Sequence, residues 1–359
     1  LALFMKYGFH LDNMDVSTAL LYADLKEANY MRAPPGMDLP EGKYLELKKA
    51  LYGLHQSSRE WYITLKTFLE KEGFKACTSD ACLFVKDTHD ISKVLIVMVY
   101  VDDIIILGKN RVIVDNLKDK FKKQYKMTDF GEAEHVLSIK VKRVKNGKKD
   151  GLYLGQGTYV QRMLEEAGYW NRDNILPSST RSNPMSPTWK HDESAVLLSK
   201  EDTEKYRSYV MQAAWVATQT RPDIAYTVNT LAQYMQTPNS SDMSALVYLF
   251  RYMRGTYDWG LVLSCENGPI ALKGFADASF AEEQGRKSRS GYSVFIDDCI
   301  VSWFSKKQTI VALSSTEAEY VALSEIAKEI LWMRELCREV GQELRDATTI
   351  MEDNKSAIA

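Results

Sequence analysis

The chain has 359 residues, of which 45% are hydrophobic and 26% charged, and its formal net charge is −2. This length and composition predict two or three domains with ordinary hydrophobic cores. No run approaches the roughly eighteen uninterrupted apolar residues of a membrane span, and the overall charge gives no sign of nucleic-acid binding.

The cysteines are odd in number, scattered, and without a Cys-x-x-Cys pair: Cys77, Cys82, Cys265, Cys299 and Cys337. This usage argues against a zinc site or a disulfide framework and favours a reducing, intracellular setting. The chain starts at Leu1, without an initiating Met or the layout of a signal peptide, so we expect an internal piece of a longer protein.

Short strands alternate with two helices, at about 58–72 and 112–126, in the part of the chain up to Gly155. This pattern predicts an α+β domain. Asp15 lies near the end of the first predicted strand, and taken alone it is an ordinary strand-end acid.

A tight, buried hairpin is predicted where Tyr100, Val101, Asp102 and Asp103 separate two apolar runs, 94–99 and 104–107. Two adjacent carboxylates repel by about 4 kcal/mol at 4 Å with an effective dielectric near 20. Asp residues are also common in turns that bind no metal, so the pair could be ordinary turn residues. With Asp15, however, the pair supplies three carboxylates, which suffice to hold two divalent ions.

Positive charge gathers in two segments, a predicted helix and a hairpin with an Asn-Gly turn: Lys118, Lys120, Lys122, Lys123 and Lys126, then Lys140, Lys142, Arg143, Lys145, Lys148 and Lys149. One interpretation is a solvated helix face and a lysine-guarded edge strand. The other is a strip that contacts phosphates.

The second half of the chain begins with a long loop or linker at about 176–202, rich in Pro, Ser, Thr and Asn. Helices follow at about 201–256, with Pro222 at a helix start and Pro238 at a break. Beyond Gly260 we expect four or five strands, one long helix at about 315–340, and a further strand.

A second set of acids occurs in this last part. Asp277 ends a predicted strand, and Asp353 follows another. Glu319 heads an apolar stripe on the long helix, whereas Glu317 lies about 200° round the helix on its polar side. Because burying an unpaired carboxylate costs several kcal/mol, Glu319 is the acid that most needs a cation.

These motifs together resemble a known family. The segments MDVSTALLYADL, LKKALYGLHQSSREWY and VYVDDIIILG look like the polymerase motifs of copia-type retrotransposon Pol polyproteins. YRSYVMQAAWVATQTRPDIAYTVNTLAQYM and LFRYMRGTYDWGL look like its helical region, and GFADASFA, SSTEAEYVAL and EDNKSAIA like its ribonuclease H domain. The resemblance implies a right-hand polymerase palm with truncated fingers at 1–155, a helical thumb or connection at 156–264, and an incomplete ribonuclease H-like α/β domain at 265–359.

The resemblance also implies roles for single residues. Asp15, Asp102 and Asp103 would be the metal ligands of the palm, and Asp277, Glu319 and Asp353 those of the ribonuclease H site. The incoming-nucleotide pocket would comprise Val16, Ser17, Thr18, Ala19, Leu20 and Gln56. Tyr100 and Val101 would lie beside the primer terminus, while Trp61 and Tyr62 have the helical spacing of core residues.

The implied activity is that of an RNA-directed DNA polymerase with ribonuclease H, using Mg²⁺ or Mn²⁺. Its partners would be an RNA template, a DNA primer, an RNA–DNA hybrid, deoxynucleoside triphosphates and the rest of the Pol polyprotein, without a membrane. The implied compartments are the cytoplasm, in a virus-like particle, and the nucleus. Two alternatives stay open: an inactive remnant that at most binds nucleic acid, and a metal-dependent nuclease that uses only the C-terminal acids.

The sequence also departs from the family pattern. Leu20 stands where an aromatic ring is usual, Ser58 where Pro is usual, and Ala23 and Ser138 where Gly is usual. Leu20 would therefore either relax the exclusion of ribonucleotides or be a plain core position. The chain begins just before the Asp15 motif and ends at Ala359, so we expect most of the fingers and the last ribonuclease H elements to be missing.

Overall fold

A computed structural model describes residues 1–146, 149–170, 180–264 and 270–358. The chain forms two compact units. Unit 1 comprises Leu1–Lys6, Ser138–Leu331 and Leu344–Ala359, and unit 2 comprises Tyr7–Leu137 and Trp332–Glu343. The three predicted domain boundaries stay a prediction.

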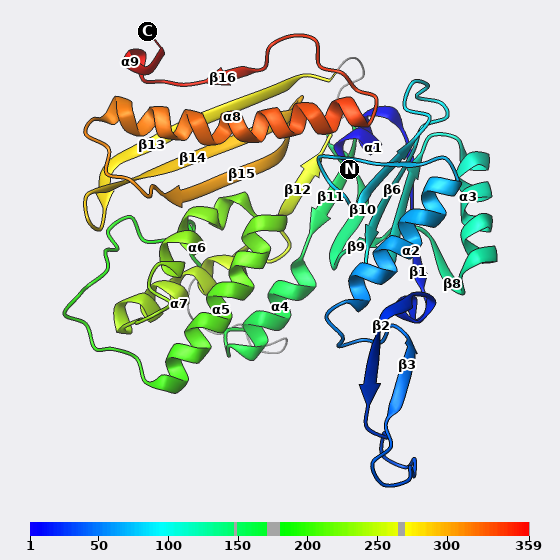
Figure 1. The fold of residues 1–359 in the computed structure, drawn as a ribbon. Helices are drawn as coiled ribbons and strands as arrows, with labels where there is room; N and C mark the ends of the chain where they lie inside the picture. Colours follow the sequence, from blue (N-terminus) through cyan, green and yellow to red (C-terminus); the bar gives the residue numbers. More distant parts are fainter. Residues whose placement is uncertain (147–148, 171–179, 265–269, 359) are drawn as a thin grey trace. The chain divides into compact units, whose positions relative to one another are not determined.

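Unit 2 is built on a six-stranded sheet in the order β4-β5-β6-β7-β1-β8, of which β1, β6 and β8 are labelled in Figure 1. Its strands are β1 (His10–Val16), β4 (Lys75–Ala76), β5 (Leu83–Lys86), β6 (Leu95–Tyr100), β7 (Asp103–Gly108) and β8 (Met127–Glu132). The predicted hairpin is confirmed: β6 and β7 are antiparallel, and Tyr100 pairs with Asp103 across the tip. The hairpin lies beside β1, where Asp15 pairs with Asp103.

Two helices pack on this sheet, α2 (Ser57–Lys71) and α3 (Arg111–Gln124), within two residues of the predicted bounds. Asn110 fixes the start of α3, because its side chain accepts hydrogen bonds from the amides of Val112 and Ile113. The core between helices and sheet includes Met14, Val16, Trp61, Leu65, Leu69, Phe84, Val97, Ile104, Ile106, Val114 and Phe121. The unit also holds η1 (Ala19–Tyr22), β9 (His135–Val136) and a ribbon of β2 (Asp24–Met31) and β3 (Leu45–Lys49).

One of the predicted surface lysines is buried. Lys118 is only 4% exposed, and its ammonium group lies 2.6 Å from Asp12 and 2.7 Å from Asp129. Arg111 donates two further hydrogen bonds to Asp12, which is fully buried. Burial opposes the ionisation of Asp12, but these two cations outweigh it and hold its pKa below the ordinary value. For Lys118, both the solvated-face and the phosphate-strip interpretations are therefore wrong.

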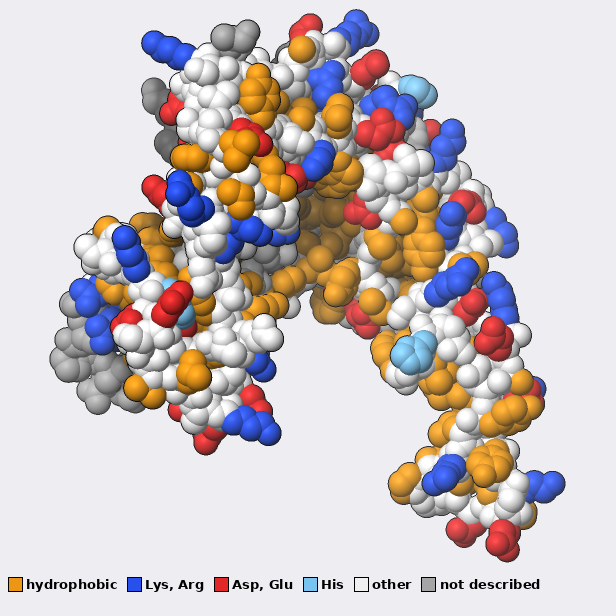
Figure 2. Space-filling view, turned by 60° about the vertical axis from the view of Figure 1, so that its left-hand side comes forward, with side chains coloured by type: hydrophobic (Ala, Val, Ile, Leu, Met, Phe, Trp, Pro, Cys, Tyr) orange, Lys and Arg blue, Asp and Glu red, His pale blue; other side chains and the backbone are white. Residues whose placement is uncertain are grey.

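Two other lysines of α3 lie next to acids. Lys120 pairs with Glu72, and Lys122 lies 2.7 Å from Asp129. On the face shown in Figure 2, Lys and Arg side chains are interspersed with Asp and Glu. Among the described residues, no helix is long and apolar enough to cross a membrane.

Unit 1 begins with the predicted basic hairpin, β10 (Ile139–Asn146) and β11 (Lys149–Gly155), which β12 (Gly260–Leu263) extends. Its turn, 147–148, lies outside the described residues, and so does 171–179 at the start of the predicted linker. Residues 180–199 form neither a helix nor a strand, as predicted. The helices are α1 (Ala2–Tyr7), whose last residue belongs to unit 2, α4 (Gly157–Glu166), α5 (Lys200–Gln219), η2 (Pro222–Ile224), α6 (Ala225–Ala232) and α7 (Ser240–Gly255). Pro222 and Pro238 mark a helix start and a helix break, as predicted.

The last part of unit 1 is a four-stranded sheet in the order β15-β14-β13-β16. Its strands are β13 (Leu272–Glu283), β14 (Lys287–Ile296), β15 (Cys299–Lys307) and β16 (Thr349–Met351), with β16 parallel to β13. Within unit 1, residues 315–331 of the helix α8 (Ser315–Glu339) run along this sheet (Figure 1), and α9 (Lys355–Ile358) follows β16. The helix comes so close to β13 that a Cβ atom at Gly274 would lie 2.6 Å from Cδ1 of Ile326.

Candidate metal centres

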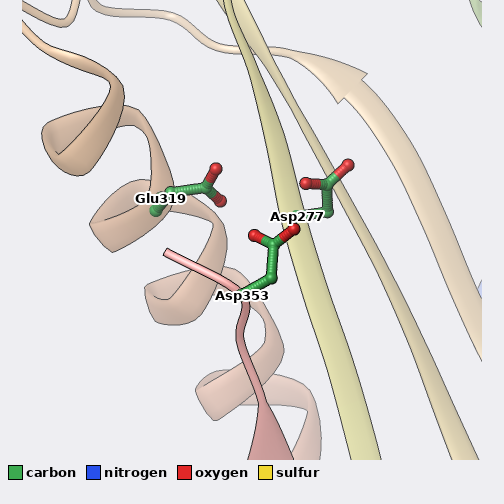
Figure 3. A group of neighbouring side chains, drawn as sticks. All are labelled: Asp277, Glu319 and Asp353. Carbon is green, nitrogen blue, oxygen red and sulfur yellow. The ribbon is translucent and has the colours of Figure 1, made fainter. Parts of the chain in front are cut away.

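Three acids from separate elements of unit 1 converge. Asp277 comes from β13, Glu319 from the second turn of α8, and Asp353 from just after β16 (Figure 3). Each offers one carboxylate oxygen, and these oxygens all lie within 4.8 Å of one another. Among the described residues, no other group of three or more His, Cys, Asp or Glu side chains meets this criterion.

Glu319 is the buried member of this triad. Glu319 is only 5% exposed, and its Oε2 has no hydrogen-bond partner. Burial, and then the charges of Glu352, Asp277 and Asp353, raise the pKa of Glu319 to about 7. A buried carboxylate with a free oxygen, next to other acids, fits a divalent cation bound by oxygen ligands.

The two glutamates at the start of α8 have different environments. Glu317 is turned away from the triad: its Oε2 accepts a hydrogen bond from the amide of Leu313, and its own amide donates to Ser314. It therefore helps to cap the helix, which agrees with its predicted place on the polar side. Sequence reasoning missed Glu352, whose Oε2 is also buried and unpartnered. Its position directly before Asp353 was the available signal.

The three acids of unit 2 lie around the tip of the β6–β7 hairpin. Asp15 on β1 and Asp103 on β7 are cross-strand partners, and Asp102 is in the turn between them. Burial and the charge of Asp102 raise the pKa of Asp15, and burial, Asp102 and Asp15 raise that of Asp103. These carboxylates do not meet the 4.8 Å criterion, and their mutual repulsion favours such separation without a cation. Their donor chemistry, three carboxylates, fits a divalent ion.

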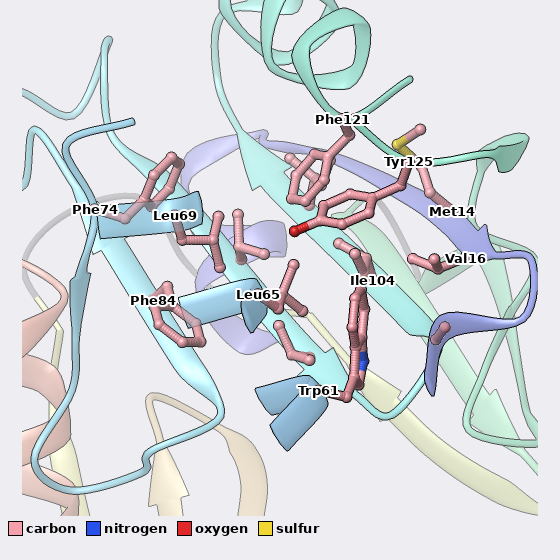
Figure 4. Close-up of a cluster of buried hydrophobic side chains, with 14 of the residues drawn as sticks. Met14, Val16, Trp61, Leu65, Leu69, Phe74, Phe84, Ile104, Phe121 and Tyr125 are labelled. Carbon is pink, nitrogen blue, oxygen red and sulfur yellow. The ribbon is translucent and has the colours of Figure 1, made fainter. Parts of the chain in front are cut away.

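The hairpin tip has an unusual backbone. Val101 has φ +55°, in the left-handed region, which costs a β-branched residue about 1–2 kcal/mol. Two hydrogen bonds from outside the hairpin hold this turn. The indole N–H of Trp61 donates to the Val101 carbonyl at 2.6 Å, and the amide of Val16 donates to the Asp102 carbonyl at 3.0 Å. Trp61 is 1% exposed within the core, as its spacing predicts (Figure 4).

The predicted nucleotide-pocket residues have mixed environments. The side chains of Val16, Ala19 and Leu20 are in the core, and Leu20 is only 3% exposed. This placement favours the core alternative for Leu20. Ser17 is half-buried and Thr18 exposed.

Other residues near the hairpin tip are more accessible. Gln56 is half-buried just before α2, and Tyr100 is exposed. Sequence reasoning missed Tyr52, an exposed residue whose hydroxyl lies 3.5 Å from the Asp102 carboxylate. Its presence in the LKKALYGLHQSSREWY motif was the available signal. The roles of these residues stay predictions.

Comparisons with known proteins find matches in one family of sequences. Residues 1–178 match the family model described as reverse transcriptase (RNA-dependent DNA polymerase). The whole chain aligns with 27% of the length of the retrovirus-related Pol polyprotein from transposon TNT 1-94 of Nicotiana tabacum, and the sequence identity is 33%. A segment of 96% of the chain aligns with 23% of the length of the corresponding polyprotein from transposon RE1 of Arabidopsis thaliana, and the sequence identity is 35%. The whole chain also aligns with 20% of the length of the transposon Ty1-BL Gag-Pol polyprotein of Saccharomyces cerevisiae, and the sequence identity is 28%.

The chain thus spans about a quarter of the length of the curated relatives it matches. A crystal structure of a prototype foamy virus protease–reverse transcriptase aligns with all of this chain and 40% of that chain. Its TM-score is 0.26 and its sequence identity 9%, too low to carry an argument. The family match and the relatives, by contrast, cover long continuous segments. Residues 1–178 belong to the reverse transcriptase family, and the chain as a whole belongs with the Pol polyproteins of copia-like transposons.

Proposed function

We propose that unit 2 carries the active site of an RNA-directed DNA polymerase, with Asp15, Asp102 and Asp103 as its metal ligands. The observation that carries this proposal is the pairing of Asp15 with Asp103 at the hairpin tip, next to Asp102. Asp102 and Asp103 are 87 and 88 positions after Asp15 in sequence, yet all three lie near the same end of the paired strands β1 and β7, in the segment that matches the reverse transcriptase family.

Two bound divalent cations would activate the attacking 3′-hydroxyl of a primer and stabilise the leaving pyrophosphate of a deoxynucleotide. The role of the chain is to orient the reactants. Asp15 and Asp103 are cross-strand partners on adjacent strands, so the backbone holds the two residues side by side. The exposed Tyr100 and Thr18 lie at the ends of β6 and β1, where they would contact the primer and the nucleotide. Lys118 is neutralised by Asp12 and Asp129, so it does not take part in phosphate binding.

We further propose that Asp277, Glu319 and Asp353 form a ribonuclease H site that cuts the RNA strand of an RNA–DNA hybrid. The carboxylate oxygens within 4.8 Å and the unpartnered Oε2 of Glu319 support this proposal. A bound Mg²⁺ would supply an activated water at neutral pH. The chain supplies Asp277 from β13 and Glu319 from α8, which orient these two ligands before the cation binds, and Asp353 from the segment after β16.

The two sites would act in succession on one nucleic acid. The polymerase would copy an RNA template from a DNA primer, and the ribonuclease H site would remove the template from the hybrid so formed. The relatives are polyproteins about four times as long as this chain, so other Pol segments would supply the remaining steps. We propose that copying occurs inside the cell, in the cytoplasmic particle of a transposon.

Primer extension on an RNA template tests the polymerase proposal. In the 359-residue chain, Asp102→Asn should lower kcat/KM at least about 100-fold, as does loss of one group that stabilises a transition state. Asp119→Asn removes an exposed acid from α3 and should leave the rate unchanged. Equal rates in both variants and the parent would reject the proposed site. Hybrid binding without any extension would instead favour the inactive remnant.

Hydrolysis of an RNA–DNA hybrid tests the second site separately. Glu319→Gln should abolish cleavage because it removes the buried ligand. Glu317→Gln, two residues earlier on the same helix, should leave cleavage nearly unchanged, since Glu317 only caps the helix. The reverse pattern would overturn the assignment. Cleavage that survives both substitutions would show that hydrolysis occurs elsewhere.

A further inference from the structure

The indole of Trp61 has a contact that packing alone does not require. Most of its ring lies in the aromatic part of the core, with centroids 5.3 Å from Tyr125 and 6.3 Å from Tyr22. A phenylalanine would fill much of this space. The indole N–H nevertheless reaches the carbonyl of Val101 at 2.6 Å, and because the ring is buried it has little freedom to rotate away.

This hydrogen bond acts on one peptide group. The carbonyl of Val101 and the amide nitrogen of Asp102 belong to the same planar unit, so fixing the carbonyl also fixes the plane of the peptide that leads into Asp102. The next carbonyl, that of Asp102, is held by Val16 on β1. Together, the two hydrogen bonds hold a turn whose first residue has a left-handed backbone that valine disfavours.

We propose that Trp61 is a positioning residue of the polymerase site. Its indole N–H holds the Val101–Asp102 peptide in the strained turn and so sets the places of the Asp102 and Asp103 carboxylates relative to Asp15. The inference rests on the proposed function in one respect, that these acids bind a divalent cation. It goes beyond that function because Trp61 touches neither a substrate nor a cation, and acts through the backbone of the turn.

Manganese affinity tests this positioning directly. Mn²⁺ binding is measured by electron paramagnetic resonance on the full chain carrying Asp277→Asn and Glu319→Gln, which removes the triad of unit 1. In this background, Trp61→Phe should weaken Mn²⁺ binding about 10- to 100-fold, as loss of a group that orients a metal ligand typically does. The matched control is Tyr62→Phe. It removes a hydrogen bond of 2.9 Å from the same helix to the carbonyl of Ala81, away from the turn, and should change the affinity less than twofold.

Two further measurements distinguish an effect on the turn from an effect on cation binding, and loss of the N–H donor from failure to fold. Hydrogen exchange of a peptide that contains Val16 reports on the turn without any cation, and Trp61→Phe should accelerate it about tenfold or more. Benzothienylalanine at position 61 keeps the shape of the bicyclic ring but lacks the N–H donor, so it covers the case in which Trp61→Phe does not fold. It should reproduce both effects.

The outcomes are distinct. Unchanged Mn²⁺ affinity and unchanged exchange with a folded benzothienylalanine variant would overturn the positioning role. Mn²⁺ binding that is insensitive to Asp15→Asn would reject the polymerase metal site, and with it the proposed function. If Val16 exchange still accelerated in that case, Trp61 would hold the turn but serve no metal site, and the inference would fail in its functional part only.

Discussion

Replacing Glu319 by Gln should make the metal-free protein more stable at alkaline pH. In the folded chain the pKa of Glu319 is raised from 4.5 to about 7 by burial and by neighbouring acids. Folding therefore favours the protonated form. The stability that this group contributes is fully present below pH 4.5 and is lost as the pH rises to about 7.

The size of this loss follows from the two pKa values. Each pH unit between them corresponds to about 1.4 kcal/mol, so ionising Glu319 lowers the free energy of unfolding by about 3 kcal/mol at pH 8. Gln does not ionise. In EDTA at pH 8, Glu319→Gln should be more stable than the parent by about this amount, whereas at pH 4 the two should differ little.

Urea unfolding of unit 1 measures the effect, with pulsed hydrogen exchange of peptides from β13 and β14 as the readout. Glu317→Gln is the control, since it makes the same chemical change on the exposed side of α8. Mg²⁺ at 1,000 times its Kd should reverse the order, because it stabilises the parent by about 4.1 kcal/mol, which exceeds the loss of about 3 kcal/mol, and it should stabilise Glu319→Gln far less. A pH-independent difference, or an equal gain in Glu317→Gln, would refute the reasoning.

Three other substitutions test the packing. Leu20→Phe should lower the free energy of unfolding by about 1–3 kcal/mol, because it overpacks a filled core; normal stability with improved rejection of ribonucleotides would restore the pocket hypothesis. Lys118→Met should destabilise unit 2 by about 3 kcal/mol in urea titrations, since Arg111 alone is left to compensate Asp12. A loss below about 0.5 kcal/mol would contradict the buried network. Ser138→Gly should stabilise the chain by about 0.5–1 kcal/mol, because Ser138 has φ +67°; thermal unfolding would contradict this if the variant melted lower.

Local pattern was enough to predict most elements. The apolar runs around Asp102 predicted the hairpin, and helical periodicity predicted α2 and α3 to within two residues. The same periodicity distinguished Glu319 from Glu317, because burial on a helix repeats every 3.6 residues. These features depend on residues close in sequence, which is why they could be read from it.

Long-range contacts could not be predicted from periodicity. The burial of Lys118 depends on Asp12 and Asp129, which come from two different strands, and a run of lysines gives no sign of such partners. The contact of Trp61 with Val101 joins residues 40 positions apart. Sequence marked Trp61 as a core residue but could not show where its N–H points. The convergence of Asp277, Glu319 and Asp353 was expected only from the resemblance to a known family.

The close approach of α8 to Gly274 links packing to the chemistry of the triad. Ile326 lies two turns after Glu319 on the same face of the helix, and Gly274 lies three residues before Asp277 on β13. A methyl group at position 274 would require the ends of the Ile326 and Ile330 side chains to shift, and any movement of the helix with them would carry Glu319 away from Asp277. The residue tolerated at 274 thus depends on the size of the one at 326. During evolution, alanine at position 274 should be tolerated only after Ile326 has been replaced by a smaller residue, so the order of these two mutations matters.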